Sequence, residues 1–153
     1  MSRRLLVPLL FLAVCSFCVA GPGQAAQVIP TEMSAFVSGS RTMIPFRALL
    51  EWMGANVDWN GARQQVTARR GGLTVVLWVG RRQAAVNGQA RPLDVAPVVI
   101  SGHTFIPLRF VAESLGDRVQ WNPQTWQVTV YDQNRVGILP VSRTGPRLTP
   151  GGR

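Results

Sequence analysis

A segment of eleven residues occurs twice, in similar form, in this chain of 153 residues. Residues 44–54 are IPFRALLEWMG, and residues 106–116, which lie 62 positions later, are IPLRFVAESLG. When residues 41–68 are aligned with residues 103–130 at this offset, 12 of the 28 positions are identical. Identity of this extent at one offset indicates an internal duplication, so a fold predicted for one copy is expected again in the other.

Each copy predicts a strand, a short helix and a hairpin, in that order. Pro45 and Pro107 stand where the helix begins, because a missing N–H costs nothing there. Gly54 and Gly116 stand where the helix ends, because glycine readily adopts the left-handed conformation that closes a helix. Apolar residues between them recur at helical spacing and predict one buried stripe on each helix. The stripes are Phe46, Leu49, Leu50 and Met53 in the first copy, and Leu108, Val111, Ala112 and Leu115 in the second.

Alternating residues after each helix predict a hairpin. Val57 and Trp59 alternate as in a half-buried strand, Val119 and Trp121 do the same, and turn residues follow in both copies. Because Trp59 and Trp121 recur, we expect both to be core residues. More strands are predicted between the copies, where Asn87-Gly88 is a strong signal for a two-residue hairpin turn.

These patterns predict one domain over residues 28–132. Its class is α+β, with antiparallel strands and hairpins, two short helices, and an internal duplication. Residues 133–153 are rich in arginine, glycine and proline, and predict a basic, mostly disordered tail. Within that tail, only Val136–Val141 could add an edge strand.

Residues 1–25 predict a secretory signal peptide. Arg3 and Arg4 precede an apolar run, Leu5–Val19, that is short for a membrane span. We place the cleavage after Ala25, with cleavage after Ala20 as the alternative. An uncleaved signal segment is a further alternative, and it is the one membrane contact that we expect. The predicted location is therefore secreted or in the cell envelope.

Cysteine usage agrees with a domain held together by its core alone. Cys15 and Cys18 are the two cysteines of the chain, and both lie inside the predicted signal peptide. After cleavage, the chain would have no disulfide, no thiolate nucleophile and no cysteine metal site.

The longest motifs resemble one known family. The run GHTFIPLRFVAESLGDRVQWN, preceded by VNGQARPLDVAPVVI, resembles the copper amine oxidase N-terminal domain, also called the stalk domain. The resemblance implies a non-catalytic module of exported bacterial proteins, which in amine oxidases is joined to the catalytic body and holds neither copper nor quinone. Consistently, Tyr131 lies in VYD rather than in a quinone-forming motif, and His103 is the single histidine. We therefore expect no enzyme activity, no metal and no cofactor.

An arginine and a glutamate recur four residues apart on each predicted helix. The pairs are Arg47–Glu51 and Arg109–Glu113, and the simplest interpretation is an i,i+4 ion pair on the surface. Because arginine before glutamate is the less favourable order for the helix dipole, we favour instead arginines that brace carbonyls of a neighbouring strand. The glutamates are also the candidate carboxylates of a small hydrolase, which is the least favoured function.

Six residues are candidates for binding a ligand. Trp52 and Trp78 lack a tryptophan counterpart in the other copy, and a partly exposed tryptophan can stack on a sugar or anchor a protein contact. We favour, however, the interpretation that they pack the two copies together. Arg69-Arg70 and Arg81-Arg82 flank the central predicted strand, so four positive charges are expected near each other, either for an anionic partner or as a solvated face.

The favoured function is an exported, non-catalytic adhesion module. Its expected partner is an anionic polymer of the cell wall or another envelope protein. A purely structural or oligomerising stalk is the alternative, and the sequence leaves the oligomeric state open. We expect no nucleic-acid partner, because the chain contains no recognised nucleic-acid motif and carries an export signal.

Overall fold

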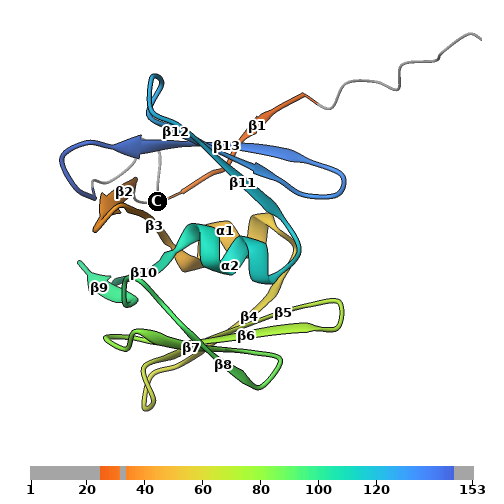
Figure 1. Cartoon of the computed structure of the whole chain (residues 1–153), viewed down its shortest axis with the longest axis vertical. Helices are drawn as coiled ribbons and strands as arrows, with labels where there is room; N and C mark the ends of the chain where they lie inside the picture. Colours follow the sequence, from red (N-terminus) through yellow and green to blue (C-terminus); the bar gives the residue numbers. More distant parts are fainter. Residues whose placement is uncertain (1–24, 32–33, 147–153) are drawn as a thin grey trace, which may run out of the picture.

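Two β-sheets enclose a pair of short helices in the computed structural model of the chain, which describes residues 25–31 and 34–146 (Figure 1). The predicted signal peptide lies outside the described residues except for Ala25, and so does the end of the predicted tail. Among the described residues, no helix is long and apolar enough to cross a membrane.

The two halves of the chain contain the same elements in the same order. The first half consists of β2 (Ala35–Ser38), β3 (Arg41–Pro45), α1 (Phe46–Trp52), β4 (Asn56–Asn60), β5 (Gln65–Arg70) and β6 (Leu73–Trp78). The second consists of β9 (Val98–Ile100), β10 (His103–Pro107), α2 (Leu108–Ser114), β11 (Arg118–Asn122), β12 (Gln127–Tyr131) and β13 (Val136–Ser142). The remaining strands are β1 (Gln27–Val28), β7 (Gln83–Val86) and β8 (Gln89–Pro92).

The strands form one eight-stranded and one five-stranded sheet. The larger sheet has the order β11-β12-β13-β2-β3-β10-β9, with β1 paired to β13, and the smaller has the order β4-β5-β6-β7-β8. Neighbouring strands are antiparallel except for β13 with β2 and β1 with β13, which are parallel. The predicted α+β class is confirmed. The eight-stranded sheet is mixed because β13, near the C-terminus, runs parallel to β1 and β2, near the N-terminus.

Both helices end in the same hydrogen-bonded motif. The N–H of Gly54 donates to Glu51 and that of Ala55 to Leu50, and the corresponding bonds close α2. This double bond pattern is a Schellman motif, which requires a left-handed residue, and Gly54 and Gly116 have φ of +69° and +92°. The predicted helix ends are therefore confirmed, and Pro45 and Pro107 are the N-cap residues.

The predicted apolar stripes point into a shared core between the sheets. All eight stripe residues are buried, and Leu49, Leu50, Leu108 and Val111 have no exposed surface. Burying one such side chain contributes about 1.5–3 kcal/mol to folding. The stripes of both helices therefore belong to the same hydrophobic cluster, which also contains residues of both sheets.

Three tight hairpin turns use residues that tolerate positive φ. Asn87 and Gly88, which join β7 to β8, have φ of +50° and +80°, so the predicted two-residue turn is confirmed. Gly39-Ser40 and Ser101-Gly102 make equivalent turns in the two halves. The hairpins that these turns close meet where β3 pairs with β10, with Ile44 directly opposite Ile106.

The prediction of a mostly disordered tail after residue 132 is wrong for residues 136–142, although the strand that we allowed at Val136–Val141 does form. These residues form β13, which pairs on one side with β12 and on the other with β2 and β1, so β13 is not an edge strand. The glycine- and proline-rich composition concealed an alternation in which Gly137, Leu139 and Val141 face the core. Pro140 is exposed, and it is tolerated because it falls between the residues that pair with β1 and those that pair with β2, so no partner strand needs its missing N–H there.

Gly137 is the tightest point beneath β13. A Cβ at this position would lie 2.7 Å from Trp52 Cζ2 and 2.8 Å from Ile29 Cδ1. Since Trp52 belongs to α1 and Ile29 follows β1, this contact joins the two ends of the domain. The absence of a side chain at Gly137 lets the strand lie directly on both residues.

Gly137→Ala is expected to destabilise the domain by about 1–3 kcal/mol, because the added methyl overpacks a filled core. The measurement is urea unfolding followed by tryptophan fluorescence. Gly72→Ala is the control, since a Cβ at Gly72 meets nothing within 4 Å. Equal stability of the two variants would contradict the close packing at Gly137.

Candidate functional site

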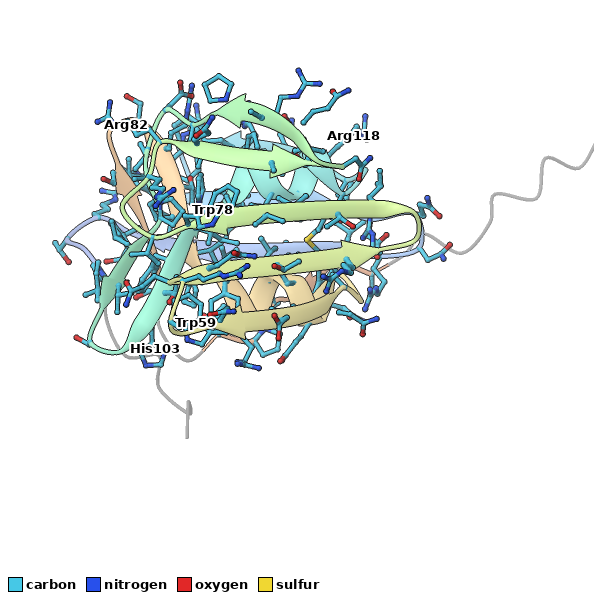
Figure 2. The ribbon with its side chains drawn as sticks, turned by 90° about the horizontal axis from the view of Figure 1, so that it is seen from below. Trp59, Trp78, Arg82, His103 and Arg118 are labelled. Atoms are coloured by element: carbon cyan, nitrogen blue, oxygen red, sulfur yellow. The ribbon has the colours of Figure 1, made fainter. Side chains whose placement is uncertain are left out.

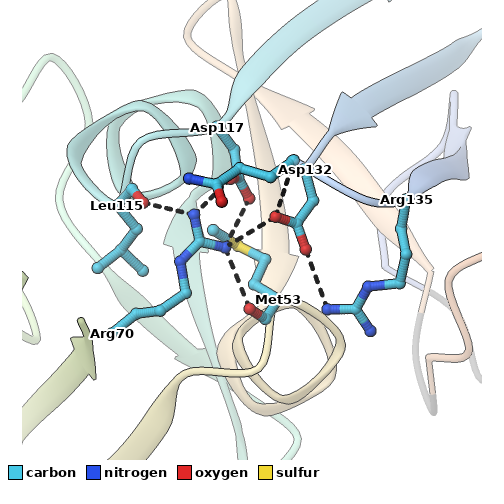
Figure 3. A network of polar contacts seen from close by, with 7 residues as sticks. Met53, Arg70, Leu115, Asp117, Asp132 and Arg135 are labelled. Carbon is cyan, nitrogen blue, oxygen red and sulfur yellow. Dashed lines mark hydrogen bonds and ion pairs between the residues drawn. The ribbon is translucent and has the colours of Figure 1, made fainter.

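Arg70 lies at the centre of a polar network between the two halves (Figure 3). Its guanidinium donates to both carboxylate oxygens of Asp117, from Nη2 at 2.5 Å and from Nη1 at 3.1 Å. It also lies 3.6 Å from Asp132, which in turn pairs with Arg135 at 3.0 Å. The side chain of Arg70 is 18% exposed and that of Asp117 is fully buried. Arg70 is therefore a structural residue, and its prediction as a ligand-binding candidate is corrected.

The same guanidinium closes both helices. Nη1 of Arg70 donates to the carbonyl of Met53 at 3.1 Å, and Nη2 donates to the carbonyl of Leu115 at 2.5 Å. Met53 and Leu115 are the C-cap residues of α1 and α2. Carbonyls at a helix C-terminus lack partners within the helix and favour a nearby positive charge. One arginine thus satisfies the ends of two helices.

The pKa values in the network follow from burial and from the ion pair. The hydrogen bond to Asp117 raises the pKa of Arg70, so the guanidinium remains charged. Burial raises the pKa of Asp117 above its ordinary value, and the hydrogen bond from Arg70 opposes that change. Because burial dominates at Asp117, this carboxylate would be strongly unfavourable without the arginine.

The role expected of Arg47 and Arg109, bracing the carbonyls of a strand, is not observed in the described part of the chain. Arg47 instead forms the simpler i,i+4 pair with Glu51, at 3.5 Å and with both side chains more than half exposed. Arg109 and Glu113, at the same spacing, form no ion pair with each other. One arginine does bind backbone carbonyls, but it is Arg70, and the carbonyls belong to the C-cap residues of the two helices rather than to a strand.

The structure decides the environments of three tryptophans that the sequence pattern alone did not settle. Trp52, a ligand candidate, packs beneath β13 and is covered by Arg135, whose guanidinium lies 5.0 Å from the ring. Its Nε1 is buried and has no hydrogen-bond partner among the described residues. Trp59, expected in the core, is 36% exposed because β4 is an edge strand. Trp121, on edge strand β11, is half-buried and does pack against the core.

The four arginines expected to gather around the central strand are separated. Arg69 and Arg70 pair with Thr74 and Leu73 at the start of β6, whereas Arg81 and Arg82 follow its end. Strand β6 has six residues, which corresponds to about 20 Å at the usual rise per residue. Arg69 is exposed and lies far from the other exposed pair.

One group of candidates does come together, at the end of the five-stranded sheet. Arg81 and Arg82 line a shallow hollow of about 500 Å³ with Arg91, which the sequence reasoning did not single out. We call it the arginine hollow; its other lining residues are Gln83, Ala90 and Pro92. None of these described lining residues is acidic. Arg91 lies nine positions after Arg82, and the hairpin predicted at Asn87-Gly88 brings it close by pairing β8 with β7, so this hairpin was the signal that could have identified it.

Trp78 lies next to the arginine hollow on the outer face of the same sheet. The pairing of Leu77 with Ala84 places Trp78 beside Gln83, which lines the hollow. The N–H of Arg81 donates to the carbonyl of Trp78 at 3.2 Å, which fixes the turn between them. Figure 2 shows Trp78 and Arg82 toward the same end of the sheet. Trp78 is half-buried, so part of its ring is available to a ligand.

No cluster of three or more His, Cys, Asp or Glu residues that could hold a metal occurs in residues 25–31 and 34–146.

Residues 24–130, which are more than half of the chain, match the family of the copper amine oxidase N-terminal domain. The chain belongs to this family. The match confirms the resemblance described above, and β13 lies beyond its C-terminal limit.

The copper amine oxidase N-terminal domain described here also resembles a larger protein. It is 29% identical over 119 residues to a protein named protease inhibitor from Brevibacillus choshinensis. The alignment covers 77% of this chain and 35% of that protein. The chain thus spans about a third of the length of this relative.

Arg70→Met is expected to destabilise this copper amine oxidase N-terminal domain by about 3–5 kcal/mol, because it leaves Asp117 buried without a counter-ion. Arg69→Met, at the exposed neighbouring position, should change the free energy of unfolding by less than about 0.5 kcal/mol. Urea unfolding at neutral pH measures both. If the two substitutions had equal effects, the network would not stabilise the fold as described.

Proposed function

We propose that this domain is an exported, non-catalytic binding module whose ligand is an anionic polymer of the cell envelope. The observation that carries the proposal is the arginine hollow. Arg81, Arg82 and Arg91 converge there without an acidic lining residue, and Trp78 lies beside them. The family match supports a non-catalytic role, since the matched family is the N-terminal domain of copper amine oxidases.

The chemistry of the arginine hollow favours carboxylate or phosphate groups. A guanidinium binds either group through two parallel hydrogen bonds, and three nearby guanidiniums favour a ligand with repeated charges. The half-buried ring of Trp78 adds an apolar surface on which a repeating unit can lie. A polymer fits the shallow, open shape better than a small ligand that must be enclosed.

Export is the second part of the proposal, and it is supported by sequence features. The apolar run, Leu5–Val19, with arginines before it and small residues after it, matches a signal peptide. Cys15 and Cys18 both fall within this segment, so the domain depends on packing and on the Arg70 network rather than on disulfides. An envelope location would place the arginine hollow among anionic polymers.

A protein ligand is the second candidate. The observation that favours it is the name of the relative from Brevibacillus choshinensis, which is a protease inhibitor. A panel of proteases assayed with and without the purified domain tests this candidate. Inhibition at stoichiometric amounts would favour a protein ligand over a polymer.

We also infer that the two halves descend from one duplicated unit. The same order of elements, the pairing of Ile44 with Ile106 and the equivalent helix ends at Gly54 and Gly116 support this origin. The arginine hollow involves β7 and β8, which lie between the two copies. The proposed binding surface is therefore an addition to the duplicated framework.

The double variant Arg81→Gln/Arg82→Gln is expected to bind purified cell wall and soluble polyanions about tenfold more weakly, since two exposed charge contacts contribute together about 1.4 kcal/mol. Sedimentation with cell wall and titration with polyphosphate measure the change at low and high salt. The wild-type affinity should fall as salt rises, because exposed charges are screened.

The matched control is Arg69→Gln/Arg118→Gln, which removes the same net charge from exposed positions elsewhere. This control should lose less than about half of the affinity, through long-range electrostatics alone. Equal losses in the two double variants would show that net charge, and not the arginine hollow, determines binding. Absence of wild-type binding at low salt would reject the proposal.

A further inference from the structure

A second hollow adjoins the arginine hollow, between α2 and the segment that follows β8. Its volume is about 290 Å³, which is near the lower limit for small-molecule sites, and Pro92 lines both hollows. Helix α2 contributes Arg109, Phe110 and Glu113 to its wall. We call it the α2 hollow.

Two opposite charges in the α2 hollow are without partners. Arg109 and Glu113 make no ion pair or hydrogen bond in the part of the chain that the structure describes. Their counterparts in the first half, Arg47 and Glu51, have the same spacing and do pair. Spacing alone therefore does not prevent the pair in α2, and both side chains are available to a ligand.

The opposite wall of the α2 hollow contains a second pair of opposite charges, and these two residues bind each other. Asp94 Oδ2 accepts from Arg41 Nε at 2.7 Å and lies 2.5 Å from Arg41 Nη2. This pair joins β3 to the segment after β8, and it leaves Arg109 and Glu113 as the charges of the hollow that are not paired among the described residues. Phe110 is half-buried and presents an aromatic surface between the charged groups.

This lining differs in kind from that of the arginine hollow. The arginine hollow offers donors with positive charge, whereas the α2 hollow offers a donor at Arg109, an acceptor at Glu113 and an aromatic ring at Phe110. A second site for phosphate or carboxylate alone would not contain an unpaired carboxylate, because like charges repel. Sugar hydroxyls, however, donate to carboxylates, and sugar rings pack on aromatic side chains.

We infer that the α2 hollow binds one sugar unit of the polymer whose acidic groups occupy the arginine hollow. The ligand is therefore an acidic polysaccharide rather than a polyphosphate or another polyanion without hydroxyl-bearing rings. This inference rests on the proposed function, and it names the class of polymer. Glu113 accepts from ring hydroxyls, Phe110 packs on the ring and Arg109 binds a carboxylate or a ring oxygen.

The direction in which one substitution changes the affinity distinguishes this inference from binding by charge alone. Glu113→Ala removes a negative charge, so a site governed by charge alone would bind every polyanion more tightly. A subsite for sugar hydroxyls instead loses its acceptor, and affinity for an acidic polysaccharide should fall about fivefold. The two probes are oligogalacturonate and polyphosphate of equal charge, titrated against the full chain by calorimetry.

The first helix provides matched controls. Glu51→Ala and Arg47→Gln change the equivalent exposed positions of α1, outside the α2 hollow, and should alter affinity for either probe less than about twofold. Arg109→Gln should weaken binding of oligogalacturonate more than binding of polyphosphate. All four positions are exposed, so the variants should fold.

The outcomes distinguish the two proposals. Weaker oligogalacturonate binding with unchanged or tighter polyphosphate binding in Glu113→Ala supports the sugar subsite. Tighter or unchanged binding of both probes overturns it, while the arginine hollow stands if Arg81→Gln/Arg82→Gln still weakens both. If wild-type protein binds neither probe, both proposals fail.

Discussion

The packing of the two halves depends on one partly buried guanidinium. Arg70 comes from the first half of the chain, and it binds the end of a helix from each half together with Asp117 of the second half. A partly buried arginine is tolerated because every group near it is an acceptor, and buried Asp117 is tolerated because Arg70 neutralises it. Each partner needs the other, so the network favours the arrangement in which both halves are packed together.

Strand alternation then divides the arginines between structure and surface. Arg69 and Arg70 are neighbours in sequence, yet one is exposed and the other lies in the network, because successive residues of β5 point to opposite faces. Three other arginines, Arg81, Arg82 and Arg91, lie together where β7 and β8 add to the first half. One arginine thus stabilises the framework, whereas these three lie at the surface, where we propose that a ligand binds.

The sequence predicted those features that depend on a few neighbouring residues. Gly54 closes α1 and Asn87-Gly88 makes a hairpin turn because both need only local backbone conformations, which the residue types themselves favour. The candidate site was predicted only in part. Trp78, Arg81 and Arg82 were among the candidates, whereas Arg91 was not. Trp52 packs against the core, which was the interpretation favoured over ligand binding, but only the position of β13 over α1 decides between the two.

By itself, the sequence determined the two similar halves, the short helices with their buried stripes, and the family to which the chain belongs. The tertiary structure decided that β13 lies inside the larger sheet, that Arg70 is internal, and that Arg109 and Glu113 face a hollow without pairing. The physical reason is the separation in sequence of the residues that interact. A turn or a helix end is set by interactions within about five residues, whereas Arg70 meets Asp117 across 47 positions, and only the packed topology brings them together.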